Sequence, residues 1–130
     1  MRAPYPWAMS SAADIADLAR SCTTVLVVSG SVYDAHRRRS NDVLASVSDR
    51  ESIVEVVDAL AAEPTDHAWM TPGGPSLVFL ADREVLLVAT WLPPDHVRCP
   101  QLWSLDAQLA RPDRLERWLL THGVGPADPK

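Results

Sequence analysis

The stretch between residues 94 and 106 holds the side chains with the greatest potential for chemistry. Asp95 and His96 place a carboxylate next to an imidazole, and Arg98 adds a guanidinium two residues later. A carboxylate can orient an imidazole that acts as a general base or acid, and a guanidinium can hold a carboxylate or stabilise an oxyanion. If the protein is an enzyme, the sequence predicts His96 as the base or acid and Arg98 as the anion ligand. Asp95 or Asp106 would then orient the imidazole.

A purely structural interpretation of the same stretch stays open. Arg98 could pair with Asp106 or Asp95 to tie two segments together, and His96 could be a solvated loop residue. Cys99 directly follows Arg98, and a neighbouring cation lowers the pKa of a thiol, so a lowered pKa is expected if this thiol is reactive. Cys99 could equally be a buried, reduced cysteine. Residue types without geometry are weak motifs, so both interpretations are kept.

Tryptophan is frequent in this chain, with Trp 5 against Tyr 2 and Phe 1. Trp118 falls on the apolar stripe of an expected helix and is predicted to lie in the core. Trp69, Trp91 and Trp103 instead border loops rich in proline or glycine, where indoles line ligand pockets or anchor interfaces. Together with Arg98, they are the predicted binding residues. The expected ligand is a partner protein or a small aromatic or anionic molecule.

Signatures of metal and cofactor chemistry are missing from the sequence. The histidines show no His-x-x-x-His or Glu-x-x-His spacing, the two cysteines are far apart, and there is no Gly-x-Ser-x-Gly elbow. Ser29-Gly30-Ser31 lacks the remaining residues of a phosphate-binding loop. The loop from Thr71 to Pro75 is expected to reverse the chain, with a lid over a pocket as the alternative. We therefore predict no metal site and no cofactor.

Hydrophobic periodicity predicts the elements that position these residues. The expected helices cover residues 11–21, 49–62 and 112–122, the second opened by a capping box of Ser48 and Glu51 and the third by Pro112. The expected strands cover residues 23–28, 43–47, 77–81 and 85–91, and residues 96–99 are expected to be a short further strand or an edge segment. Short connections favour antiparallel pairing. The predicted fold class is therefore α+β: a two-layer sandwich with a mostly antiparallel sheet of four to five strands, about three helices and the order α-β-β-α-β-β-(β)-α.

Length and charge limit the kind of protein further. The chain has 130 residues, which fits a single domain, and we expect this domain at residues 10–124, between an N-terminal arm at 1–9 and a loose tail at 125–130. No apolar run reaches the ~18 residues of a membrane span and the first residues do not resemble a secretory signal, so a cytoplasmic location without membrane contact is expected. The net charge of −5 argues against nucleic acid as a partner. The cluster Arg37-Arg38-Arg39 is expected to be a solvated loop.

Residues 76–124 combine an apolar hairpin, a turn that leads to an arginine, an Asp-Ala segment and a helix that ends in Trp-Leu and Gly-Val. These pieces are Leu77 to Leu80, Val85 to Thr90, Arg98, Asp106-Ala107 with Leu109, and Pro112 through Trp118-Leu119 to Gly123-Val124. In this order they resemble a group of small uncharacterised bacterial proteins, seen largely in actinobacteria. The resemblance implies an α+β fold and no particular activity. Proteins of this group tend to carry histidines and glycine where this chain has Leu92-Pro93-Pro94-Asp95, so the resemblance implies no shared polar site.

The sequence supports two functional hypotheses. In the preferred one, the protein is a small cytoplasmic bacterial interaction module, an immunity, regulatory or accessory protein that binds a cognate protein. The reasons are the missing catalytic signatures, the acidic balance and the Trp and Arg residues at loop edges. In the other, it is a small enzyme or ligand-binding protein of specialised metabolism, with a pocket lined by tryptophans and with His96, Asp95 and Arg98 as the working residues. Whether the protein is catalytic stays open, and a homodimer is compatible with the sequence.

Overall fold

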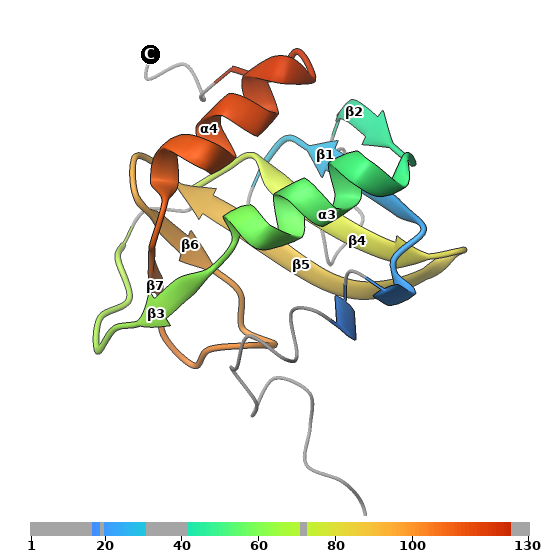
Figure 1. Cartoon of the computed structure of the whole chain (residues 1–130). Helices are drawn as coiled ribbons and strands as arrows, with labels where there is room; N and C mark the ends of the chain where they lie inside the picture. Colours follow the sequence, from blue (N-terminus) through green and yellow to red (C-terminus); the bar gives the residue numbers. More distant parts are fainter. Residues whose placement is uncertain (1–16, 19, 31–41, 71–72, 126–130) are drawn as a thin grey trace, which may run out of the picture.

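The structure of the protein, a computed structural model, describes residues 17–18, 20–30, 42–70 and 73–125 (Figure 1). The expected arm, most of the first predicted helix, the arginine cluster at 37–39 and residues 126–130 of the tail lie outside the described residues. The described residues at the end of the first predicted helix, 17–18 and 20–21, are helical. No helix in the described part of the chain has the length and apolar character needed to cross a membrane.

Among the described residues, one antiparallel sheet of seven strands forms the centre of the fold. The strands are β1 (Thr24–Val28), β2 (Val43–Val47), β3 (Ala62–Pro64), β4 (Ser76–Ala81), β5 (Glu84–Leu92), β6 (His96–Arg98) and β7 (Ala107–Leu109). Their order across the sheet is β2-β1-β4-β5-β6-β7-β3, and every neighbouring pair runs antiparallel. The predicted pairing of β1 with β2 and the predicted β4–β5 hairpin are confirmed.

The strands β3 and β7 raise the number of strands above the predicted four to five. Each has three residues, which is too short for a period-2 pattern to stand out in the sequence. The two strands pair with each other, with Ala62 opposite Leu109 and Pro64 opposite Ala107. This pairing places residues 62–64, which follow the helix at residues 50–59, at the same end of the sheet as β6.

The helix α3 (Arg50–Ala59) begins at a different N-cap from the predicted one. The Oδ2 atom of Asp49 accepts a hydrogen bond from the backbone N–H of Ser52 at 2.9 Å, so Asp49 takes the role expected of Ser48. Hydrogen bonds from Ser52 also lower the pKa of Asp49, because they stabilise the carboxylate. The helix ends before residue 62, because residues 62–64 form β3.

The helix α4 (Pro112–Thr121) agrees with the prediction at both ends, with proline in its first turn and Gly123 at φ 83 after its last. Together α3 and α4 are the two helices for which bounds are described, fewer than the predicted total of about three. The coarse prediction of helices packed on a mostly antiparallel sheet is therefore confirmed, whereas the predicted counts differ.

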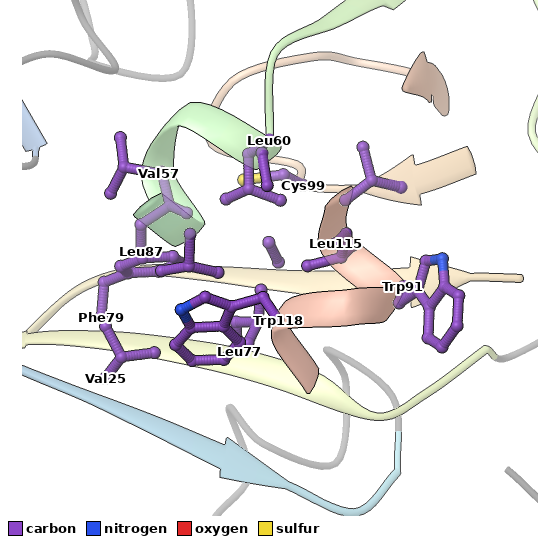
Figure 2. Packing of buried hydrophobic residues seen from close by; sticks show 14 of the residues in the cluster. Val25, Val57, Leu60, Leu77, Phe79, Leu87, Trp91, Cys99, Leu115 and Trp118 are labelled. Atoms are coloured by element: carbon purple, nitrogen blue, oxygen red, sulfur yellow. The ribbon is translucent and has the colours of Figure 1, made fainter. Parts of the chain in front are cut away.

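Both helices lie on one face of the sheet and enclose the main hydrophobic core (Figures 1 and 2). Alternate residues of a strand point to opposite faces, so Val25, Leu77 and Phe79 face the helices. The helices bury Ile53, Val56, Val57, Leu115, Trp118 and Leu119 against them. The residues in between form a smaller apolar cluster on the other face, which consists of Val28, Val78 and Val88 with partly buried neighbours.

The loop that ends at Pro75 packs directly on the end of the sheet. The hydroxyl of Ser76 donates to the carbonyl of Gly30 at 2.8 Å and lies 2.8 Å from the Oγ1 atom of Thr90 in the buried interior. Gly73 has φ +74, and a Cβ atom there would lie 2.4 Å from the Cδ2 atom of Leu92. This close packing fits the predicted chain-reversing loop. Residues 71–72 lie outside the described residues.

Along part of β5, the side chain of Gln101 makes the backbone hydrogen bonds that a neighbouring strand would otherwise make. The strand β6 pairs with residues 90–92 of β5. Further along β5, the Oε1 atom of Gln101 accepts a hydrogen bond from the backbone N–H of Val88 at 3.0 Å, and its Nε2 atom donates to the carbonyl of Leu86 at 3.5 Å. The amide group thus satisfies backbone groups that β6 does not reach.

Replacing Gln101 by leucine is expected to lower the free energy of unfolding by about 1 to 3 kcal/mol, because the N–H of Val88 loses its acceptor. Urea unfolding of the purified variant measures the effect. The matched control is Gln108→Leu, at an exposed glutamine of β7, which we expect to change the stability by less than about 0.5 kcal/mol. Equal losses in both variants would contradict a role for the hydrogen bond.

Candidate functional site

A buried ion pair, which we call the clasp, consists of Arg98 of β6 and Asp106, directly before β7. The Nε atom of Arg98 lies 2.8 Å from Oδ1 of Asp106, and its Nη2 atom lies 3.0 Å from Oδ2. Asp106 is 1% exposed, and the Arg98 side chain is also largely covered. Paired hydrogen bonds of this fork geometry are strong and compensate for the loss of hydration of both charges. The clasp is therefore a rigid support at this end of the sheet.

The clasp fixes the loop at residues 65–70 through its backbone. Oδ2 of Asp106 accepts a hydrogen bond from the N–H of Trp69 at 2.8 Å, and Nη2 of Arg98 donates to the carbonyl of Trp69 at 2.6 Å. The main chain of Asp106 holds the preceding turn, since its N–H donates to the carbonyl of His67 and its carbonyl accepts from Thr65. Thr65, His67 and Trp69 are thus tied to the clasp through hydrogen bonds, and residues 66–70 are all exposed.

The indole of Trp69 contacts two imidazoles at the surface. Its ring centroid lies 4.2 Å from that of His96, with the planes inclined by 45°, and 5.6 Å from that of His67, with the planes inclined by 59°. Trp69 remains 42% exposed, and the next side chain, Met70, is 99% exposed. We call His67, Trp69, Met70 and His96 the Trp69 surface. It presents aromatic and apolar atoms to solvent on a backbone that the clasp holds in place.

His96 also has the carboxylate contact predicted for an acid or base. Its Nδ1 atom lies 2.8 Å from Oδ1 of Asp95, and both side chains are partly exposed. Of the two carboxylates predicted to orient the imidazole, Asp95 is therefore the one in contact, whereas Asp106 belongs to the clasp. When Nδ1 of an imidazole is bound to a carboxylate, its Nε2 atom can exchange a proton with a bound molecule.

The surroundings of Arg98 and Cys99 do not match the roles that the enzymatic interpretation gives them. The guanidinium of Arg98 binds Asp106 and the carbonyl of Trp69, which is the structural interpretation of the sequence. Cys99 is fully buried, and burial raises the pKa of its thiol to about 12. The lowered pKa expected for a reactive Cys99 is therefore wrong. Burial also raises the pKa of Cys22.

Trp91 and Trp103 lie in the core and not beside Trp69. They are 2% and 4% exposed, and both belong to the main hydrophobic core; Figure 2 shows Trp91 at the edge of the group of side chains that it draws. Neither indole N–H has a hydrogen-bond partner among the described residues. Of the three tryptophans predicted to bind a ligand, the structure places only Trp69 at the surface. The alternation of β5 carries a signal for the burial of Trp91, which shares a face with Leu87 and Ala89.

His67 and Met70 belong to the Trp69 surface although no motif singled them out. Both lie within two residues of Trp69, and this closeness to an exposed indole is the one local signal for them. His67 contributes a ring contact and Met70 an exposed apolar chain. In the part of the chain that the structure describes, no three His, Cys, Asp or Glu side chains gather as a metal site requires.

Comparisons with protein-family models, with curated proteins and with solved structures found no match to this chain. The likeness of residues 76–124 to a group of small bacterial proteins therefore stays a prediction.

Proposed function

We propose that the protein is a non-catalytic interaction module that binds another protein through the Trp69 surface. The observation that carries the proposal is the exposure of Trp69, whose backbone the clasp holds, and of the neighbouring Met70. A loop that is already rigid loses little conformational entropy on binding, and tryptophan is enriched among the residues that dominate interface affinity. Met70 adds a flexible apolar group that adapts to the shape of a partner.

The charges near the Trp69 surface favour a basic partner. Asp66 contacts His67 and Asp95 contacts His96, so carboxylates border the surface at two points. The whole chain has a net charge of −5. Opposite charges at the rim of an interface accelerate association, and salt weakens this effect. A cognate protein with a basic and apolar docking surface fits these features, and an immunity, regulatory or accessory role would make use of it.

The alternative function, a small enzyme or ligand-binding protein, is supported by the contact between Asp95 and His96. In this hypothesis, His96 acts as the acid or base and Asp95 orients it. The other residues predicted for this role are engaged elsewhere, because Arg98 and Asp106 form the clasp. The described geometry thus supports the interaction module better than it supports the enzyme.

Replacing Trp69 by alanine is expected to weaken the binding of the cognate protein about thirty-fold or more, since a central indole contributes about 2 kcal/mol or more to an interface. The full-length protein is immobilised, and the products of the neighbouring genes are tested one at a time for their dissociation constants. Leu44→Ala, at an exposed leucine of β2, serves as the matched control and should leave the affinity unchanged.

Two outcomes would count against this function. If a partner binds the Trp69→Ala and Met70→Ala variants as tightly as the wild type, the Trp69 surface is not the docking site. If no neighbouring product binds, and a reaction is found whose rate falls in Asp95→Asn and His96→Asn but not in Met70→Ala, the enzymatic alternative replaces the proposal.

A further inference from the structure

A groove with a volume of about 610 Å³ runs between α3 and α4 on the outer side of the helix layer. Its walls include Val54, Glu55 and Asp58 from α3 and Arg114, Arg117 and Thr121 from α4. The helices run antiparallel, because Asp58 near the end of α3 pairs with Arg114 near the start of α4, while Trp118 near the end of α4 donates to the carbonyl of Ser52 at 2.9 Å. This groove is separate from the Trp69 surface, which lies on the loop at 65–70 and on β6.

The two walls of the groove carry opposite charges. On α3, Asp58 is already bound by Arg111 and Arg114 at 3.2 and 3.1 Å. Glu55 forms no ion pair with the other described residues. On α4, Arg117 lies 3.6 Å from Asp113 of its own helix, and an exposed pair of this kind contributes little. Glu55 is thus left without an ion pair among the described residues, and Arg117 has one exposed ion pair.

Each helix also exposes an apolar side chain near these charges. Val54 of α3 is 46% exposed and Leu120 of α4 is 55% exposed. The outer side of a helix that packs on a sheet is normally polar. Each helix thus combines an exposed apolar residue with a charged residue of the groove, and the charge is negative on α3 and positive on α4.

We infer that this helix face, defined as Val54, Glu55, Arg117 and Leu120, binds a second copy of the chain. A two-fold axis parallel to the groove places α3 of one protomer over α4 of its partner, because such an axis exchanges the two walls. Glu55 then faces the partner's Arg117, and the reciprocal contact forms at the other side of the axis. Every helix lies antiparallel to the helix that it faces, as in an antiparallel four-helix arrangement.

The size of the face agrees with a weak, reversible dimer. Each helix has 10 residues, which corresponds to a length of about 15 Å at 1.5 Å per residue. Two helices packed ~10 Å apart offer a face about 20 Å wide, so the dimer would bury on the order of 600 Å² in total, which is below the ~1,000 Å² of most specific interfaces and typical of a weak contact. We expect a dissociation constant on the order of 100 μM. The inference goes beyond the proposed function, since it uses a different surface and a different partner.

Sedimentation equilibrium of the full chain at concentrations from ~1 to ~500 μM tests the inference. The wild type is expected to change from monomer to dimer over this range. Glu55→Arg and Arg117→Glu should each raise the dissociation constant at least tenfold, because each places like charges opposite each other. An equimolar mixture of the two variants should form dimers again, since both contacts of the mixed dimer join opposite charges.

Matched controls reverse the same charge types away from the helix face. Glu84→Arg and Arg83→Glu lie at the β4–β5 turn, and both should dimerise as the wild type does. Recovery of dimers in the mixture also shows that both variants fold. If either charge variant fails to fold, Leu120→Ser, at an exposed position, replaces it and should weaken the dimer. A wild type that stays monomeric at every concentration, or a dimer that none of these helix-face variants weakens, would overturn the inference.

Discussion

Replacing Arg98 by methionine is expected to lower the free energy of unfolding by about 3 to 5 kcal/mol. Methionine keeps the apolar part of the side chain but removes the guanidinium, so the carboxylate of Asp106 stays buried without its cation. The carbonyl of Trp69 also loses its donor. This loss is large for a domain whose total stability is typically 5 to 15 kcal/mol, because a buried charge without a partner is more costly than a missing contact.

Urea unfolding, followed by circular dichroism, measures this effect. The matched control is Arg111→Met, because Arg111 also pairs with an aspartate, Asp58, at 3.2 Å, but at the exposed surface. The control should lose less than about 1 kcal/mol. In Arg98→Met/Asp106→Asn, part of the stability should return, since the buried negative charge is gone. Equal losses for Arg98→Met and Arg111→Met would show that the burial of the clasp does not matter.

Replacing Gly73 by alanine is expected to lower the free energy of unfolding by about 2 to 5 kcal/mol. The left-handed conformation at φ +74 is unfavourable for alanine by about 1 to 2 kcal/mol. The new Cβ atom would also lie 2.4 Å from Cδ2 of Leu92 and 2.9 Å from the carbonyl oxygen of Trp91, so the loop or β5 has to move. Overpacking of a tight site typically costs a further 1 to 3 kcal/mol.

Gly123→Ala separates these two contributions. Gly123 has a similar conformation, with φ +83, but its Cβ atom would meet nothing within 4 Å. Thermal and urea unfolding should therefore show a loss of only about 1 to 2 kcal/mol for this variant. If both alanine variants lose the same stability, the close approach of Gly73 to β5 makes no contribution of its own.

The longer elements could be predicted because their patterns repeat along the chain. The β4–β5 hairpin shows period-2 alternation, and α4 has both an apolar stripe and end signals. The N-cap of α3 could not be chosen from the sequence, because Ser48 and Asp49 are both good caps and only the contact with Ser52 decides. The strand β3 forms because it pairs with β7, and β7 forms because it pairs with both β6 and β3; neither has a local sequence pattern of its own.

The candidate site could be predicted only in part, for a related reason. The pairing of Arg98 with Asp106 was one of the interpretations of the sequence, since the residues are close in the chain and opposite in charge. The contact between Trp69 and His96 joins segments that are distant in sequence, and it depends on the β3–β7 pair and on the clasp. Trp103 carries no periodic signal, so its burial follows only from the tertiary packing.

The strand order also has a consequence for how the chain folds. The strands β4, β5, β6 and β7 follow one another in sequence and in space, so they need only short loops to close. The strand β3 can pair only after β7 is in place, and β7 comes much later in the chain. The β3–β7 pair therefore forms more slowly than a hairpin, because it requires the closure of a long loop. The loop at 65–70 connects β3 to the strands β4 to β7, and its backbone is held by Arg98 and Asp106. We therefore expect the Trp69 surface to be assembled late, so that a partly folded chain does not yet present it.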